Sequence, residues 1–215
     1  MGERNYLIEG VSGSGKTSVA TELQRRGYHV VHGDRDLAYK GDPLSGRPLD
    51  FSTLDQSRLD MAFRHRHHIW DVEKVKSLMS DKVHRLSFFC GGARNFHSFI
   101  DSFDEVFVLE VDVDTLKKRL SERPEDEFGG KPEEQEFVLK LHATKEETPG
   151  NATIIDATAP LASVVDDILS RCAPGEANTL CPQLALSRND NEGSGLPRHK
   201  AAAVVLTNEG RSELL

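Results

Sequence analysis

The stretch GVSGSGKT at residues 10–17 constrains this 215-residue chain more than any other feature. It fits the pattern G-x-x-x-x-G-K-[ST], and it lies between an apolar run at residues 6–11 and an amphipathic helical pattern marked by Val19, Ala20 and Leu23. Glycines in such a loop let backbone N–H groups point inward, and the helix N-terminus adds a positive partial charge. The stretch therefore predicts a loop that binds the phosphates of ATP or GTP.

Individual roles follow from the chemistry of this loop. Lys16 is expected to reach the β- and γ-phosphates, and Thr17 is expected to ligate Mg²⁺. A plain glycine turn with a solvated Lys16 is the alternative, which the flanking pattern disfavours. We therefore expect ATP and Mg²⁺ as cofactors, and the predicted nucleotide contacts are Gly10, Ser12, Gly13, Ser14, Gly15, Lys16, Thr17 and Ser18.

Apolar, strand-like runs alternate with helical periodicity as far as about residue 172. The runs lie at residues 6–11, 28–33, 85–92, 105–111 and 153–158. Nearly continuous apolar runs are typical of parallel strands that helices cover on both faces. The chain is therefore predicted to form a three-layer α/β domain over residues 1–172.

Three segments depart from this alternation. Residues 40–82 hold no obvious strand and predict a helical insertion over the sheet, which would bind substrate. Residues 124–132 are charged, contain paired glycines and predict a mobile lid. Residues 173–215 have no aromatic residue and no sustained period, so they predict a largely disordered tail.

Charge and cysteine content limit the partners. A net charge of −8 disfavours nucleic acid as the main partner, and no apolar run reaches membrane-spanning length. The three cysteines, Cys90, Cys172 and Cys181, form no CxxC pair and predict reduced thiols. The expectation is a cytoplasmic protein, monomeric or homodimeric, whose partner is a small molecule.

Two carboxylates, Asp34 and Asp36, follow the second predicted strand, at the edge where open α/β sheets bind ligands. Alternation in an extended segment would point both toward the phosphate loop. One would then support the hydrated Mg²⁺, and the other would orient or deprotonate a substrate hydroxyl. The alternative is a solvated turn with Asp34 as a helix cap.

The phosphate loop, this D-x-D, the GGAR at residues 91–94 and the LKKRLSERP at residues 116–124 together resemble the nucleoside and nucleotide kinases among P-loop proteins, in the branch containing shikimate and gluconate kinases. The resemblance covers residues 5–172. It implies a three-layer α/β/α P-loop fold whose five-stranded parallel sheet has the order 2-3-1-4-5, with a helical insertion and a lid. It also implies catalytic roles for Lys16, Asp34, Asp36 and Arg123.

In detail, the resemblance implies that Asp34 assists the metal and that Asp36 contacts the acceptor hydroxyl. Arg119 would pack against adenine, and Arg123 would reach the transferring phosphate. Gly91 and Gly92 would let the backbone approach the acceptor. Cys90 departs from the pattern, because many nucleotide kinases carry an acidic residue there.

The sequence leaves the acceptor itself open. The arginine-rich helix that grips a carboxylate substrate after the lid is absent, which disfavours shikimate. A nucleoside would need a carboxylate base such as Asp36, and Phe63 or Trp70 could stack on its base or lie in the core. A nucleoside monophosphate would need two or more convergent arginines from Arg58, Arg64, Arg66 and Arg94, of which Arg64 and Arg94 are the favoured acceptor contacts.

The leading expectation is an ATP- and Mg²⁺-dependent kinase acting on a small hydroxyl-bearing metabolite, with a nucleoside or nucleoside monophosphate favoured. One alternative is a regulatory nucleotide-binding ATPase or switch that phosphorylates no small molecule. The other alternative is a sugar-acid kinase of the gluconate-kinase type.

Overall fold

The computed structural model describes residues 2–146 and 148–172. The chain divides into the units Met1–Asn178 and Thr179–Leu215. The predicted disordered tail, residues 173–215, lies outside the described residues. The fold and the site described below therefore belong to the first unit alone.

A five-stranded sheet forms the centre of this unit, and every strand pairing in it is parallel. Its order is β2-β5-β1-β6-β7. Numbered along the chain among themselves, these strands have the order 2-3-1-4-5, so the predicted topology is confirmed. The strands are β1 (Gly2–Glu9), β2 (His29–His32), β5 (His84–Cys90), β6 (Glu105–Glu110) and β7 (Thr153–Asp156).

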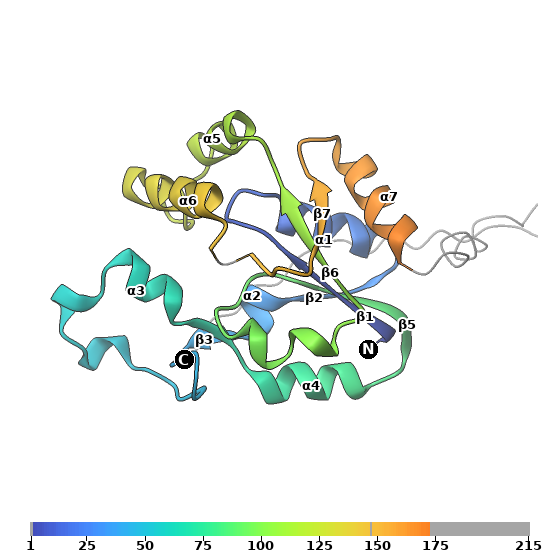
Figure 1. Ribbon diagram of the computed structural model, residues 1–215, viewed down its shortest axis with the longest axis horizontal. Helices are drawn as coiled ribbons and strands as arrows, with labels where there is room; N and C mark the ends of the chain where they lie inside the picture. The colour runs from blue at the N-terminus through green and yellow to red at the C-terminus, as the bar shows by residue number, and fades with distance from the viewer. Residues whose placement is uncertain (1, 147, 173–215) are drawn as a thin grey trace, which may run out of the picture. The chain divides into compact units, whose positions relative to one another are not determined.

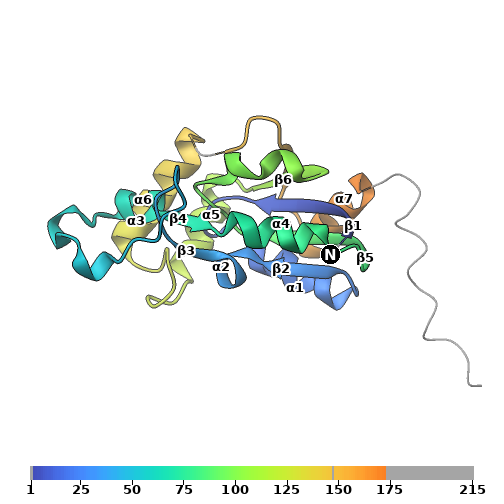
Figure 2. The same ribbon diagram turned by 90° about the horizontal axis from the view of Figure 1, so that it is seen from below.

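Helices cover both faces of this sheet, as Figures 1 and 2 show. On one face Leu23, Leu116 and Val165 pack in a cluster with Phe88 and Phe107 of the sheet. On the other face the chain between β4 and β6 contributes most of a second cluster, which includes Trp70, Val75 and Phe99. The longer helices are α1 (Lys16–Arg25), α4 (Val72–Ser80), α5 (Val113–Ser121), α6 (Pro132–Thr144) and α7 (Leu161–Arg171).

Aspartates begin three of the helices. The carboxylate of Asp60 accepts a hydrogen bond from the Phe63 N–H at 2.7 Å, at the start of α3 (Met61–Arg66). Asp71 and Asp112 cap α4 and α5 in the same way. Each cap satisfies a backbone donor that has no partner within its helix, which fixes where the helix starts.

The prediction that residues 40–82 form a helical insertion without a strand is wrong in part. Two three-residue strands, β3 (Ala38–Lys40) and β4 (His68–Trp70), pair antiparallel beside the main sheet. Strands this short show no periodicity that a sequence pattern could detect. Between them lie α3 and the 3-10 turns Phe51–Thr53 and Gln56–Arg58; two further such turns are Phe96–Ser98 and Ile100–Ser102.

The insertion and the segment after the lid lie beside each other. In both ribbon views α3 is close to α6, on the same side of the sheet. The ring centroids of His65 on α3 and Phe137 on α6 are 5.2 Å apart in an edge-on arrangement. Among the described helices, none is long and apolar enough to cross a bilayer.

Candidate active site

The phosphate loop joins the end of β1 to the first turn of α1. Gly13 has φ of 84°, in the left-handed region that glycine adopts without strain. The hydroxyl of Ser14 is buried and has no hydrogen-bond partner among the described residues. The ammonium of Lys16 donates to the carbonyl oxygens of Gly10 (2.5 Å) and Val11 (3.1 Å). The loop thus holds one buried donor, the Ser14 hydroxyl, without a partner among the described residues.

Lys16 is surrounded by charge as well as by backbone. Burial lowers the pKa of Lys16, and the carboxylates of Asp34 and Glu9 oppose that shift. An ammonium held by loop carbonyls is available to phosphate oxygens, because an anion is a stronger partner than a neutral carbonyl. Lys16 therefore lies where the sequence predicted a phosphate contact.

Thr17, Asp34 and Cys90 border a small hollow of about 30 Å³ behind the loop, together with Lys16. A hydroxyl and a carboxylate are the oxygen ligands that Mg²⁺ prefers, and Mg²⁺ usually takes few protein ligands beside phosphate and water. Burial raises the pKa of Cys90, so its thiol stays neutral. The donor set of Thr17 and Asp34 therefore fits Mg²⁺, although the described part of the chain holds no group of three or more His, Cys, Asp or Glu side chains that could bind a metal ion by itself.

Arg119 on α5 joins the phosphate loop to the loop after β7. Its guanidinium donates to the carbonyls of Ser14 (3.1 Å), Gly13 (3.4 Å) and Ala157 (2.9 Å). Arg119 is therefore half-buried against the loop rather than solvated on the helix surface. Its guanidinium plane lies between the two segments that flank the far end of the pocket, where we expected the adenine.

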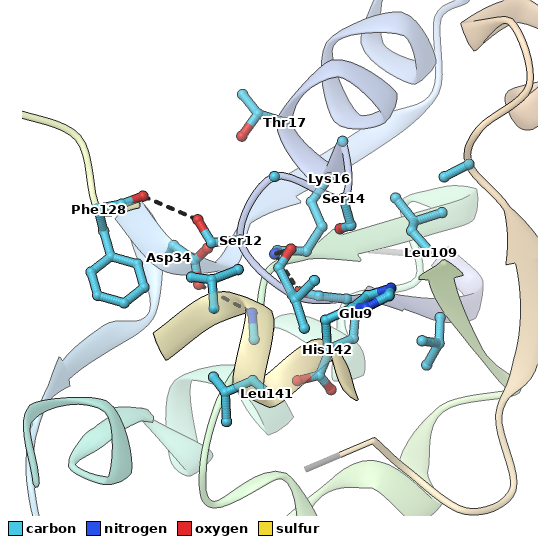
Figure 3. Close-up of a pocket in the computed structure, with 18 of the residues that line it drawn as sticks. Glu9, Ser12, Ser14, Lys16, Thr17, Asp34, Leu109, Phe128, Leu141 and His142 are labelled. Carbon is cyan, nitrogen blue, oxygen red and sulfur yellow. Dashed lines mark hydrogen bonds between the residues drawn. The ribbon is translucent and has the colours of Figure 1, made fainter. Parts of the chain in front are cut away.

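Residues of the predicted lid contact the phosphate loop directly. The guanidinium of Arg123 donates to Ser12 Oγ and to the carbonyl of Phe128 at 3.0 Å, and it pairs with the Glu127 carboxylate at 3.1 Å. Ser12 Oγ donates to the same Phe128 carbonyl at 3.1 Å, which Figure 3 draws as a dashed line. In this state Arg123 fastens the lid segment to the loop, and its acidic neighbour Glu127 takes part.

Asp34 points its carboxylate into the pocket at the end of β2. Oδ1 accepts from the Gly92 N–H at 3.1 Å and lies 3.3 Å from His68 Nε2. Burial opposes ionisation, but the contacts with His68, Lys16 and Gly92 outweigh it and lower the pKa of Asp34. Asp34 therefore stays ionised across the neutral range, as a metal-supporting carboxylate should.

The prediction that Asp36 faces the phosphate loop beside Asp34 is wrong. Residues Gly33–Asp36 form a short helix, α2, rather than an extended segment. Residues two apart in a helix point about 200° apart around its axis. Asp36 Oδ2 accepts the backbone N–H of His32 at 3.1 Å, and Asp36 does not line the pocket.

A carboxylate that sequence reasoning missed, Glu9, lines the pocket instead. Glu9, the last residue of β1, is 4% exposed and pairs with the Arg94 guanidinium at 2.8 Å. Its second oxygen, Oε2, is buried and accepts no hydrogen bond from the described residues. Burial raises the pKa of Glu9 to about 7, against the opposing charges of Arg94 and Lys16. The signal for Glu9 was present, since it is the one charge that interrupts the apolar run YLIEGV.

Of the other residues predicted to contact the acceptor, some line the pocket and one lies behind it. Gly92, Arg64 and Arg94 line the pocket, whereas Gly91 does not. A Cβ at Gly91 would lie 2.7 Å from the Trp70 ring and 2.8 Å from Asp34 Oδ1, so this glycine makes room for both. Trp70 itself is fully buried, which excludes the interpretation that it stacks on a base.

These groups enclose one cleft of about 1140 Å³, which runs from the loop after β7, past the phosphate loop, to the insertion. Figure 3 shows Glu9, Lys16 and Asp34 on its wall, with Leu141 and His142 of α6 drawn in front. We call the part lined by the phosphate loop and Ala157 the phosphate end, and the part lined by Asp34 and Arg64 the acceptor end, after the roles predicted from the sequence.

Comparison with known proteins gives a family and several likenesses. Residues 7–139 match the sequence model of the AAA domain. No curated protein matched the chain.

Among solved structures, a shikimate kinase from Bacteroides thetaiotaomicron aligns at 15% identity over 78% of this chain and 97% of that one, with a TM-score of 0.49. A sugar kinase from Janibacter sp. HTCC2649 aligns at 18% identity over 78% and 92%, with a TM-score of 0.47. A deoxyadenosine kinase from M. mycoides with bound dATP aligns at 15% identity over 78% and 98%, also with a TM-score of 0.47. Likenesses at these identities carry no functional conclusion.

Proposed function

We propose that this chain, which belongs to the AAA domain family, is an ATP- and Mg²⁺-dependent kinase that phosphorylates a hydroxyl group of a small metabolite. One observation carries the proposal: Glu9, whose buried carboxylate oxygen Oε2 has no partner among the described residues, lines the same cleft as the phosphate loop. A buried acceptor of hydrogen bonds costs free energy unless a ligand satisfies it. A substrate hydroxyl is such a ligand.

The residues divide the reaction among them. Lys16 leaves the carbonyls of Gly10 and Val11 and binds the β- and γ-phosphates of ATP. Arg123, released from Ser12 and Phe128, contacts the γ-phosphate and helps to neutralise its charge. Arg119 supports the loop from the side of the adenine. Mg²⁺, held by Thr17 and Asp34, would neutralise further phosphate charge.

Glu9 accepts the proton that the acceptor hydroxyl loses. The acceptor oxygen forms a bond to the γ-phosphorus, the bond from this phosphorus to the bridging β–γ oxygen breaks, and ADP leaves. The hydroxyl proton passes to the Glu9 carboxylate. A pKa of about 7 suits this task, because a general base works best when its pKa is near the operating pH. Asp34, whose pKa is lowered, suits the metal rather than the proton.

The acceptor favoured by this site remains a nucleoside or a nucleoside monophosphate. From the insertion, Arg64, His65 and His68 line the acceptor end. Of the four arginines considered from the sequence, Arg64 and Arg94 line the cleft and Arg66 does not, while the Arg58 side chain lies outside what the structure describes.

The test is a coupled assay for ADP release with nucleosides, nucleoside monophosphates, gluconate and shikimate as acceptors. We expect one class to stimulate turnover well above the rate with water. Direct detection of the phosphorylated acceptor distinguishes transfer from stimulated hydrolysis. If no acceptor raises the rate above the water background, the protein is a nucleotide-binding ATPase or switch and the kinase proposal is wrong.

A further inference from the structure

Two basic side chains line the acceptor end of the cleft, and the reaction described above uses neither of them. Lys40 is the last residue of β3, and its strand partner across the β3–β4 pair is His68. Arg64 lies on α3. Both side chains line the cleft and are solvent-accessible there.

Arg64 is held in place by contacts that leave its charge uncompensated. Its Nε donates to the carbonyl of Leu59 at 2.9 Å, and its guanidinium carbon lies 5.8 Å from the centroid of the Phe51 ring. A carbonyl and a ring face orient a guanidinium without neutralising it. Its terminal nitrogens make no hydrogen bond within residues 2–146 and 148–172.

Lys40 and Arg64 are close enough to influence each other. Burial lowers the pKa of Lys40, and the charge of Arg64 lowers it further. In the described part of the chain, neither side chain forms an ion pair with a carboxylate. Two neighbouring cations without a counterion are unfavourable in the empty cleft and become favourable when an anion binds.

Arg94 lines the same cleft but differs from Lys40 and Arg64 in having a carboxylate partner. Its guanidinium is buried and paired with Glu9, so its charge is already balanced by the protein. The cleft therefore presents a hydroxyl-binding group at Glu9 and an unbalanced positive pair at the insertion. A substrate that matches both has a hydroxyl at one end and a negative charge at the other.

We propose that Lys40 and Arg64 form an anion subsite, which binds a carboxylate or phosphate group of the acceptor while its hydroxyl lies at Glu9. The proposal rests on the kinase function proposed above. It narrows the acceptor to an anionic hydroxyl compound, such as a nucleoside monophosphate or a sugar acid, and disfavours neutral nucleosides.

The test uses matched acceptors that differ in the anionic group. AMP and adenosine form the phosphate pair, and gluconate and glucose form the carboxylate pair. Titration calorimetry of the full chain, loaded with a non-hydrolysable ATP analogue and Mg²⁺, measures binding of each without any transfer. We expect one anionic member to bind at least tenfold more tightly than its neutral match, and the pair that responds identifies phosphate or carboxylate.

Variants then assign the effect to the two residues. Lys40→Gln and Arg64→Gln should each weaken binding of that anionic acceptor about tenfold and leave its neutral match unchanged, because a charge-assisted hydrogen bond is lost. Arg47→Gln is the matched control, since Arg47 is an exposed arginine in the same insertion that does not line the cleft. Its binding constants should stay within twofold of wild type.

Three results would overturn the subsite: equal binding of both members of each pair, binding of no compound, or losses in Lys40→Gln and Arg64→Gln no larger than in Arg47→Gln. Failure of the kinase proposal looks different. In that case the anionic acceptor binds with the expected dependence on Lys40 and Arg64, but no phosphorylated product forms when ATP replaces the analogue.

Discussion

The two ends of the cleft are built in contrasting ways. The phosphate end comes from one continuous stretch, residues 10–18, supported by Arg119 and Arg123 from the chain that follows β6. The acceptor end is assembled from separate segments that contribute Glu9, Asp34, Lys40, Arg64 and Arg94. The first depends on local backbone conformation, and the second depends on how distant segments fold together. The difference predicts that substitutions at the phosphate end remove activity outright, whereas those at the acceptor end alter stability, selectivity or pH dependence.

The largest expected effect is at the phosphate end. Lys16→Ala should lower kcat/KM for ATP by about 10³-fold or more, because it removes the cation that contacts the transferring phosphate. Steady-state ADP release measures this loss. The matched control is Lys76→Ala, whose side chain is half-exposed on α4 and pairs with Glu73. Near-normal turnover in Lys16→Ala would show that the loop does not support catalysis.

At the acceptor end, Arg94→Met should destabilise the fold by about 3 kcal/mol at pH 8, since it leaves the Glu9 charge buried without a partner. Urea unfolding measures the change. The double variant Glu9→Gln/Arg94→Met should recover much of the loss, because no unpaired charge remains. If the double variant is as unstable as the single one, packing of Arg94 rather than its charge is what matters.

Asp34 lines the pocket, whereas Asp36 accepts a backbone N–H outside it, so the same substitution at the two positions tests which carboxylate takes part in the reaction. Asp34→Asn should lower kcat by about 100-fold and raise the Mg²⁺ concentration needed for half-maximal rate, because the carboxylate supports the metal. Asp36→Asn should keep kcat within about threefold, since its side chain can still accept the His32 N–H. A larger loss in Asp36→Asn than in Asp34→Asn would reverse the assignment.

The smallest effect concerns Glu9 and pH. Its pKa is about 7 in the folded protein and 4.5 in the reference state, so between these values the folded state keeps a proton that the unfolded chain has released. The free energy of unfolding therefore falls as pH rises from about 4.5 to 7. Wild type should lose about 2 kcal/mol across this window relative to Glu9→Gln.

Urea unfolding at several pH values compares the two proteins, and their difference cancels every group that they share. If the difference in the free energy of unfolding between the two proteins does not change with pH, folding does not shift the pKa of Glu9. If wild type instead gains stability relative to Glu9→Gln as pH rises, Arg94 lowers the pKa of Glu9 more than burial raises it.

The contrast between the two ends also separates the features that could be predicted from the sequence from those that could not. The phosphate loop and the pocket position of Asp34 depend on local patterns, because each involves contiguous residues at the end of a strand, whereas the order of the parallel sheet was predicted from the family resemblance. The same-side placement of Asp36 was wrong, because the chain enters a helix at Gly33 rather than continuing extended. The strands β3 and β4 were missed because their pairing joins residues about 30 positions apart.

Glu9 was missed for a different reason. Its position in an apolar run is typical of a buried strand, and only the folded structure shows that this strand ends at the cleft with Arg94 beside it. The acceptor end therefore cannot be derived from spacing alone. It needs the tertiary arrangement that brings residues 9 and 94 together.

Trp70, fully buried and the single tryptophan of the chain, has a practical consequence. Its ring would touch a Cβ placed at Gly33 or at Gly91, the residues that precede Asp34 and Gly92. It also stacks on Phe99 with ring centroids 5.6 Å apart. Any movement of Asp34 or Gly92 when substrate arrives will change the surroundings of this indole. The protein thus carries its single tryptophan directly behind the acceptor end, where selective excitation of this indole can report ligand binding in the unlabelled chain.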